Sequence, residues 1–190
     1  MIASRVSDGL VDIIEAILYA ADGPVSAGRL LEVLLEARTA PDSADLDVDM
    51  VRSACLELEE RYRAGDSALQ VVEIAGGYRL GTRPRFDGVI RVLRQTERPT
   101  QLSIPVLETL AVVAYRQPTT IAEIHSIRGK DPGATLRRLR DLRLVRITGR
   151  RRAVGRPFTY GTTDRFLELF GLRDLKELPS EEEFQELLET

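Results

Sequence analysis

Apolar residues recur every three or four positions along much of the first half of the chain, the spacing of amphipathic helices. The first set predicts a helix that ends at Asp22-Gly23-Pro24, after which Ser26 has the residue type of a helix N-cap. A third helix follows residues 39–47, whose polar composition predicts a loop. The apolar positions of the three helices are Leu10, Ile13, Ile14, Ile17 and Leu18; Leu30, Leu31, Leu34 and Leu35; and Val51, Ala54, Cys55, Leu58 and Tyr62.

Two short runs of β-type residues, 69–74 and 78–81, come next. Gly76-Gly77 between them can supply the positive φ angles of a tight hairpin turn. A further helix is predicted around Phe86, Val89, Ile90 and Leu93, and residues 94–101, with Pro99, predict a linker.

The second half repeats this order of elements. Ser103 and Thr120 have the type and place of helix N-caps, and Arg116-Gln117-Pro118 ends the helix between them. The later predicted elements are a third helix at 134–143, strands at 144–148 and 158–161 around a basic loop, and a helix after Thr162 and Thr163. The apolar helix positions are Leu107, Leu110, Ala111 and Ala114; Ile121, Ile124 and Ile127; Leu136, Leu139 and Leu142; and Phe166, Leu167 and Phe170.

The two halves align at a single offset of 94 residues, which pairs Ala20 with Ala114, Pro24 with Pro118, Ser26 with Thr120 and Leu30 with Ile124. Three helices followed by a hairpin is the element order of a winged helix-turn-helix. We therefore predict a mainly α protein with small β-hairpins (α+β), built from two tandem winged helix-turn-helix domains. The alternative is one continuous α+β domain with a chance internal similarity.

The predicted boundaries are 1–95 for the N-terminal domain, 96–102 for a linker, 103–172 for the C-terminal domain and 173–190 for an acidic tail. In the tail, Ser180 is expected to begin a short helix with Phe184, Leu187 and Leu188 on one side. Such an acidic amphipathic segment is more typical of docking on its own domain or on a partner than of binding DNA.

The net charge of −3 is unevenly distributed. Residues 1–66 hold 6 basic and 14 acidic side chains, whereas residues 128–156 hold 11 basic and 2 acidic ones. Such asymmetry indicates a surface for a polyanion or for a complementary protein. Arginine outnumbers lysine 25 to 2, as a codon bias would produce, but a codon bias does not explain why acidic residues are scarce in 128–156.

Few residues could carry catalysis or bind a metal. One cysteine and one histidine exclude a disulfide within the chain, a thiolate zinc cluster and a histidine-based metal site. Cys55 is expected to pack in a core and His125 to be structural or exposed, and no cofactor or membrane contact is expected. Because no signal peptide or membrane-spanning run is present, we expect a cytoplasmic binding protein rather than an enzyme.

A winged helix first suggests DNA binding. The helix at 134–143 would present Arg137 and Asp141 outward, flanked by Arg138 and Arg140, and it has no Asn or Gln to read base edges. Sequence-specific recognition is therefore disfavoured, although a winged-helix transcriptional regulator remains the alternative function. The candidate patch for nucleic acid or for an acidic partner is Arg137, Arg138, Arg150, Arg151, Arg152 and Arg156. The alternative interpretation is that the arginines of the loop are only a solvated hairpin tip.

Three groups of motifs resemble the segregation and condensation protein B family, an accessory subunit of the bacterial SMC–kleisin complex. They are Leu107–Pro118 with Ile121–Ile124 and Ile127–Gly129; Gly155–Pro157, Tyr160–Thr163, Phe166-Leu167 and Phe170–Leu172; and Val72–Leu80 with Thr82–Pro84. Leu175 and Leu178-Pro179 match the family's end. The resemblance runs from about Leu10 to Pro179, and the turn Lys130–Gly133 departs from it.

The resemblance implies a homodimer formed through the N-terminal domain and a site for the kleisin subunit, segregation and condensation protein A. It implies no catalytic activity, since ATP hydrolysis belongs to the SMC subunit, and it implies a place in the cytoplasm on the nucleoid. Apolar side chains around Leu110, Tyr115, Phe166 and Phe170 are expected to support or line the kleisin site, some of them as core residues.

Overall fold

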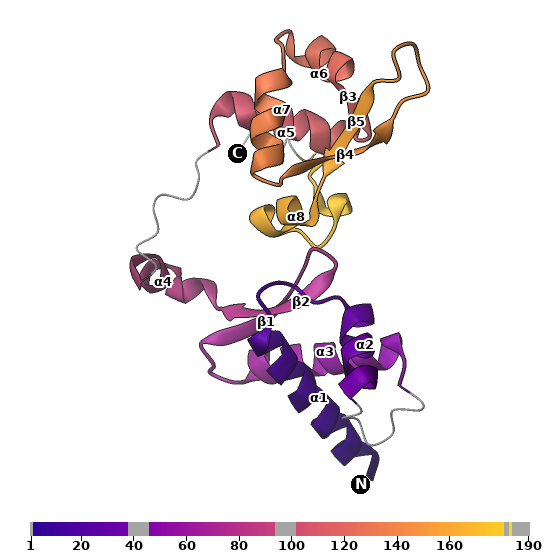
Figure 1. Ribbon diagram of the computed structural model, residues 1–190. Coiled ribbons are helices and arrows are strands. Elements are labelled where there is room, and N and C mark those ends of the chain that lie inside the picture. The colour runs from indigo at the N-terminus through magenta and orange to yellow at the C-terminus, as the bar shows by residue number, and fades with distance from the viewer. Residues whose placement is uncertain (1, 38–45, 94–101, 181–182, 184–190) are drawn as a thin grey trace. The chain divides into compact units, whose positions relative to one another are not determined.

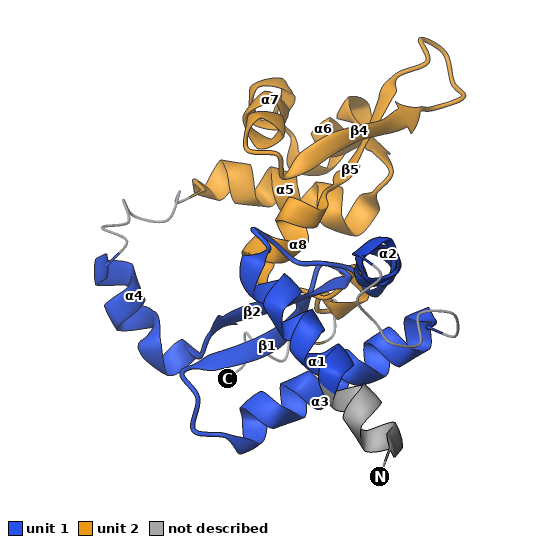
Figure 2. Cartoon of the chain, turned by 60° about the horizontal axis from the view of Figure 1, so that its bottom comes forward, with its two compact units in different colours: residues 1–96 blue, residues 97–190 orange. Residues whose placement is uncertain are grey.

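The computed structural model describes residues 2–37, 46–93, 102–180 and 183 (Figure 1). Within these ranges the chain has eight α-helices and two small antiparallel sheets, so the predicted mixed α and β class is confirmed. The chain divides into two compact units, unit 1 at Met1–Thr96 and unit 2 at Glu97–Thr190 (Figure 2). Of the predicted linker 96–102, only Leu102 lies within the described residues. No helix in those ranges has the length and apolar character required to cross a membrane.

Unit 1 consists of three longer helices, a hairpin and a short helix. In order these are α1 (Ile2–Ala20), α2 (Ala27–Ala37), α3 (Val48–Ala64), β1 (Leu69–Ile74), β2 (Gly77–Thr82), a 3-10 turn (Pro84–Phe86) and α4 (Asp87–Leu93). The predicted cap is confirmed for α2, where the Ser26 hydroxyl accepts a hydrogen bond from the Arg29 N–H at 3.2 Å. Asp47, expected in a loop, caps α3 by accepting from the Met50 N–H at 2.8 Å. Residues 39–45 of that predicted loop lie outside the described residues.

The core of unit 1 lies between α1, α2 and α3, with the hairpin packed against it. Its fully buried side chains include Val11, Ile14, Leu30, Leu34, Val51 and Leu58. Cys55 is also fully buried there, as predicted. By contrast, α4 contributes no buried residue, and Val89, Val92 and Leu93 on it are exposed.

The turn of the first hairpin differs from the prediction. Ala75 and Gly76 take the positive φ angles, 51° and 69°, rather than Gly76 and Gly77. Gly77 is needed for a different reason, because a Cβ there would lie 2.8 Å from the carbonyl carbon of Val25. Val25 and Tyr78 exchange two backbone hydrogen bonds of 2.9 Å, which hold the segment before α2 beside the hairpin.

Unit 2 has the same order of helices and hairpin, with one more strand and with its 3-10 turn after the last helix instead of before it. It comprises α5 (Ile104–Arg116), β3 (Thr119–Thr120), α6 (Ile121–Arg128), α7 (Gly133–Asp141), β4 (Val145–Arg150), β5 (Phe158–Thr162), α8 (Asp164–Phe170) and a 3-10 turn (Leu175–Glu177). The sheet order is β3-β5-β4, and the β4–β5 hairpin extends beyond the helices of its unit (Figure 1). The third helix ends two residues earlier than predicted, and Arg143 after it has a φ of 58°.

Strand β3 was not predicted, and it extends the internal repeat. Thr119 pairs with Tyr160 in unit 2, as Val25 pairs with Tyr78 in unit 1. Val25 and Thr119 are again 94 residues apart. The two halves therefore share backbone pairing as well as sequence pattern.

The core of unit 2 lies beneath α5, α6 and α7. It includes Leu110, Val113, Ile124, Leu136, Leu139, Tyr160 and Phe166. The assignment of Leu107 and Ala111 to the same side of α5 as Leu110 was wrong, because both are exposed. The grouping of Ile121 and Ile127 with Ile124 was also wrong, since only Ile124 is buried.

The described part of the tail ends near a helix start. Ser180 and Glu183 exchange hydrogen bonds, with the Ser180 N–H donating to the Glu183 carboxylate at 2.7 Å and the Glu183 N–H donating to the Ser180 hydroxyl at 3.2 Å. This reciprocal pattern is a capping box. The predicted apolar side of the tail helix, Phe184, Leu187 and Leu188, lies outside the described residues.

Candidate functional site

The described residues offer little for catalysis. Within them, no three His, Cys, Asp or Glu side chains gather where they could hold a metal ion. Burial raises the pKa of the Cys55 thiol to about 12, so the thiol stays protonated at neutral pH. His125 is exposed on α6. The candidate features described below are surfaces of the two units.

The four predicted kleisin-site residues divide into two pairs. Leu110 and Phe166 are 1% and 3% exposed and belong to the core of unit 2. Tyr115 and Phe170 are 48% and 46% exposed. The Phe170 ring lies 4.9 Å from that of Phe166, centroid to centroid, in a tilted arrangement. Leu110 and Phe166 can thus support a surface, whereas Tyr115 and Phe170 can contact a partner.

A row of exposed apolar side chains follows α5, and we call it the α5 stripe. It consists of Ile104, Leu107, Ala111 and Tyr115, which are spaced by three and four residues and so share one side of the helix. Ile104 is 73% exposed and Leu107 is 40% exposed. The core uses the opposite side of the helix, through Leu110 and Val113. Sequence reasoning missed Ile104, Leu107 and Ala111 as surface residues.

The C-terminal end of the α5 stripe is held by a later segment of the chain. The Tyr115 hydroxyl donates a hydrogen bond of 2.8 Å to the carbonyl of Pro179. Leu178, next to Pro179, packs against the core of unit 2. Leu178 and Pro179, in the first part of the predicted tail, therefore hold the ring of Tyr115 against unit 2.

A basic groove of about 420 Å³ lies between α7 and β4, and we call it the arginine groove. Its walls are Arg137, Arg140, Asp141, Arg143, Val145, Arg146, Ile147 and Thr163. Of the two predicted helix arginines, Arg137 lines the groove, and Arg138 is exposed on α7 but is not one of the lining residues. The structure adds Arg140, Arg143 and Arg146, which the predicted patch omitted.

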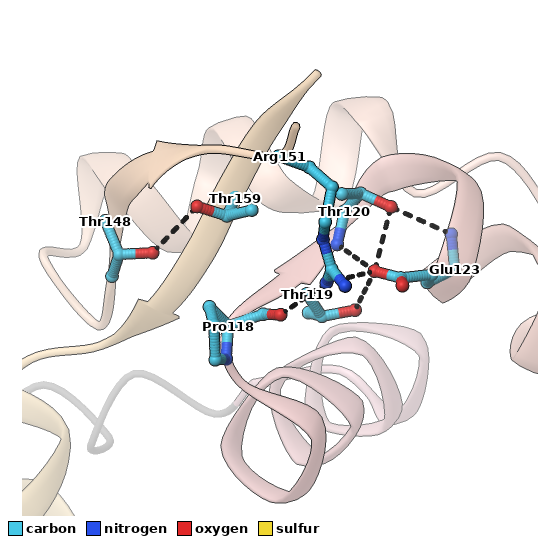
Figure 3. Close-up of polar contacts among 7 residues, drawn as sticks. All are labelled: Pro118, Thr119, Thr120, Glu123, Thr148, Arg151 and Thr159. Carbon is cyan, nitrogen blue, oxygen red and sulfur yellow. Dashed lines mark hydrogen bonds and ion pairs between the residues drawn. The ribbon is translucent and has the colours of Figure 1, made fainter. Parts of the chain in front are cut away.

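The predicted hairpin arginines are partly engaged within unit 2. The Arg150 guanidinium lies 4.0 Å from the centre of the Phe158 ring and donates to the Arg156 carbonyl at 3.1 Å. Arg151 donates to the Pro118 carbonyl at 2.8 Å and to the Glu123 carboxylate at 3.0 Å (Figure 3). Arg152 and Arg156 have exposed side chains. The six predicted basic residues therefore differ in their surroundings: Arg137 lines the arginine groove, Arg150 and Arg151 contact other residues of unit 2, and the other three are exposed.

Glu123 connects the hairpin to the start of α6. Its carboxylate accepts hydrogen bonds from the Thr120 N–H at 2.8 Å and from the Thr120 hydroxyl at 2.9 Å, while the Glu123 N–H donates to the same hydroxyl (Figure 3). This confirms Thr120 as the N-cap and makes a complete capping box. The bonds from Thr120, with help from the charge of Arg151, hold the pKa of Glu123 below its usual value.

Unit 1 has an apolar groove of about 490 Å³ between α1 and α2. Its walls are Asp12, Ile13, Ala16, Ile17, Ala20, Val33, Leu34 and Ala37, so Asp12 is the one charged residue among them. The small alanine side chains leave room for a side chain from another molecule.

Comparison with known proteins identifies the family. Residues 12–181 match the family described as segregation and condensation complex subunit ScpB. The segregation and condensation protein B of Syntrophotalea carbinolica is 46% identical over 92% of this chain and 83% of its own length. The protein of the same name from Moorella thermoacetica is 44% identical over 91% of this chain and 83% of its own length.

Two solved structures are also similar in sequence. The crystal structure of ScpB from Mycobacterium tuberculosis is 32% identical and aligns with a TM-score of 0.39 over 87% of this chain and 97% of that one. A conserved hypothetical protein from Chlorobium tepidum is 34% identical, with a TM-score of 0.41 over 89% of this chain and 99% of that one. On the extent of the family match and the identity to its relatives, the chain belongs to the segregation and condensation protein B family, whose members are subunits of the segregation and condensation complex.

Proposed function

We propose that this protein is a non-catalytic scaffold subunit that binds the kleisin subunit, segregation and condensation protein A, in chromosome condensation and segregation. The observation that carries the proposal is the α5 stripe, where Ile104, Leu107 and Tyr115 are exposed although α5 buries its opposite side in a complete core. Exposed apolar rows of this kind are typical of protein-binding surfaces. Membership of the segregation and condensation protein B family is the reason for proposing the kleisin as the partner.

Unit 2, residues 103–172 in the predicted boundaries, carries the kleisin site in this proposal. Tyr115 and Phe170 are its accessible aromatic residues, and Leu110 and Phe166 support them from the core. Aromatic side chains bury a large area with few rotatable bonds, so they commonly supply much of the binding energy of an interface. Through the kleisin, the protein would join the SMC ATPase on the nucleoid in the cytoplasm.

Each unit is proposed to be a winged helix. The support is the shared order of three helices and a hairpin, together with the equivalent backbone pairs Val25–Tyr78 and Thr119–Tyr160. In this interpretation β1–β2 and β4–β5 are the two wings. In this proposal the winged helix of unit 2 binds protein through α5, whose exposed side is apolar rather than basic.

The N-terminal domain, residues 1–95, is proposed to form a homodimer. The groove between α1 and α2 supports this, because its walls are almost entirely apolar and include Ala16 and Ala20, which a partner helix can approach closely. An apolar groove exposed to water is unfavourable by roughly 25 cal/mol per Å² of apolar surface. A second copy would remove that surface from water.

Co-expression with the kleisin tests the proposed function. We expect the two proteins to elute together from a size-exclusion column in a fixed ratio, with a mass by light scattering above that of either protein alone. Separate elution of the two proteins at micromolar concentration would contradict the proposal. A regulator of transcription would instead bind one DNA sequence tightly in the absence of the kleisin.

A further inference from the structure

Three arginines of the arginine groove have no ion pair among the described residues, unlike several arginines of unit 1. In unit 1, three exposed arginines are matched with acids one turn away: Arg29 with Glu32, Arg52 with Asp49, and Arg63 with Glu59 and Glu60. Within the described ranges, Arg137, Arg140 and Arg143 form no ion pair, although Asp141 lines the same groove. The four arginines of the groove therefore outnumber its one carboxylate, and the groove keeps a net positive charge.

We propose that the arginine groove binds the phosphodiester backbone of duplex DNA without sequence preference. Four guanidinium groups, from Arg137, Arg140, Arg143 and Arg146, line it against a single carboxylate. Guanidinium groups bind phosphate oxygens in a bidentate manner and stay charged at all physiological pH values. Arg146 is oriented by a hydrogen bond of 3.3 Å from its Nε to the Thr162 carbonyl.

The lack of exposed apolar residues on α7 favours a nucleic acid over an acidic protein as the partner of the groove. Leu136 and Leu139 of α7 are buried, and Leu142 packs against the core, so α7 exposes no large apolar side chain. Protein partners derive most of their binding energy from apolar or aromatic anchors that fill pockets. A nucleic acid needs only clustered cations, because its binding is driven by the release of the counterions around its phosphates. The α5 stripe is apolar, whereas the arginine groove is basic, so the two surfaces suit different classes of partner.

The shape of α7 favours DNA over RNA. Its nine residues form a rod of about 13 Å, bearing Arg137, Arg138 and Arg140 on its exposed side. The major groove of B-form DNA admits a helix, whereas that of A-form RNA is too narrow. α7 has no Asn or Gln, and its Asp141 disfavours close approach to most base edges, so the contact is expected to be with the backbone.

Fluorescence anisotropy with a labelled duplex of mixed sequence, about 30 base pairs long, tests the proposal on the full chain. If four phosphates are neutralised, affinity falls about 150-fold between about 50 and 200 mM salt. The groove variant Arg137→Gln, Arg140→Gln, Arg143→Asn is expected to bind more weakly, and its affinity falls only about 3- to 4-fold over the same range. Asparagine is chosen at 143 because it tolerates the positive φ there.

A matched control is Arg29→Gln, Arg52→Gln, Arg63→Gln, which removes the same charge from ion-paired positions of unit 1. It is expected to keep the salt dependence of the unmodified chain. Asp141→Asn removes the carboxylate from the groove and is expected to tighten binding about threefold or more, a gain that a misfolded variant could not produce.

Three results would overturn the proposal. They are absence of duplex binding at low salt, equal loss in the groove and control variants, and displacement of the duplex by polyglutamate at equal charge concentration. The last result would assign the groove to an acidic protein. Kleisin binding by the groove variant is expected to be unchanged, so failure here is distinguishable from failure of the proposed scaffold function.

Discussion

The guanidinium of Arg128, at the end of α6, bridges to two neighbouring residues of α5. Its Nη2 donates to the Glu108 carboxylate and its Nη1 to the Thr109 hydroxyl, each at 2.5 Å. The Arg128 side chain is 7% exposed, whereas that of Glu108 is 56% exposed. Water can therefore solvate the Glu108 carboxylate if Arg128 is removed, but it can hardly reach the Arg128 guanidinium if Glu108 is removed.

Removing Glu108 is expected to destabilise unit 2 more than removing Arg128. Glu108→Ala leaves a buried guanidinium without its counter-charge, at a cost of about 2 kcal/mol or more, whereas Arg128→Met replaces the charge with an apolar side chain and costs about 1 kcal/mol or less. Urea unfolding followed by circular dichroism measures both. Glu32→Ala, which breaks an exposed pair with Arg29, serves as a control expected to change stability little. The reverse order of the two unit 2 variants would contradict this account.

The capping box of α6 predicts a loss of stability in acid. The folded pKa of Glu123 lies below its unfolded value of about 4.3, because the N–H and hydroxyl of Thr120 bind its carboxylate. Its stabilising contribution is therefore complete above about pH 4.3 and is lost as the pH falls through the folded pKa. Glu123→Gln is expected to be less stable than the unmodified chain at pH 7, and the difference shrinks in acid. A difference that is constant from pH 7 to about pH 3 would show that the ionised form is not the one stabilised.

Two glycines of the same strand are expected to respond differently to an added methyl group. At Gly77 a Cβ would lie 2.8 Å from the backbone carbon of Val25, whereas at Gly81 nothing lies within 4 Å. Gly77→Ala is therefore expected to cost about 1–3 kcal/mol by overpacking, and Gly81→Ala to be close to neutral. Thermal unfolding compares the two variants. Equal melting temperatures would argue against the close approach of the segment before α2 to the hairpin.

The proposed dimer predicts a change of mass when the groove of unit 1 is altered. The chain weighs 21.2 kDa, so light scattering of the unmodified protein is expected to give about twice that mass. Ala16→Glu places a charge in the apolar groove and is expected to reduce the mass toward that of one chain. Ala64→Glu, at the exposed end of α3, is the control and is expected to remain a dimer. A mass of about 21.2 kDa for the unmodified chain would contradict the proposed dimer.

Helix positions and caps were predictable because they depend on neighbouring residues. Ser26, Thr120 and Thr163 each accept a hydrogen bond from the N–H three residues later, as their place before an apolar run indicated. Ser103 takes the predicted N-cap position of α5, but its side chain makes no capping hydrogen bond. Strand β3 was not predictable in this way. Its two residues pair with β5 about 40 positions later, and such a short strand carries no alternation of its own.

The surfaces were only partly predictable. Helix α5 has apolar residues on most of its circumference, so periodicity alone could not separate Leu110, which is buried, from Leu107, which is exposed. The arginine groove combines α7 with β4, and Arg146 joins Arg137 only because the chain turns at Arg143. The scarcity of acids in residues 128–156 was the part of this feature visible in the sequence.

The affinity of the protein for its kleisin, measured by titration calorimetry, tests the central claim most directly. Leu107→Glu places a charge in the α5 stripe without touching the core, and Val154→Glu places the same charge on a fully exposed hairpin position of the same unit. Leu107→Glu is expected to weaken binding at least about 30-fold, equivalent to about 2 kcal/mol, and Val154→Glu to leave it unchanged. Equal affinity of the two variants, with both folded, would contradict the assignment of the α5 stripe as the kleisin-binding surface.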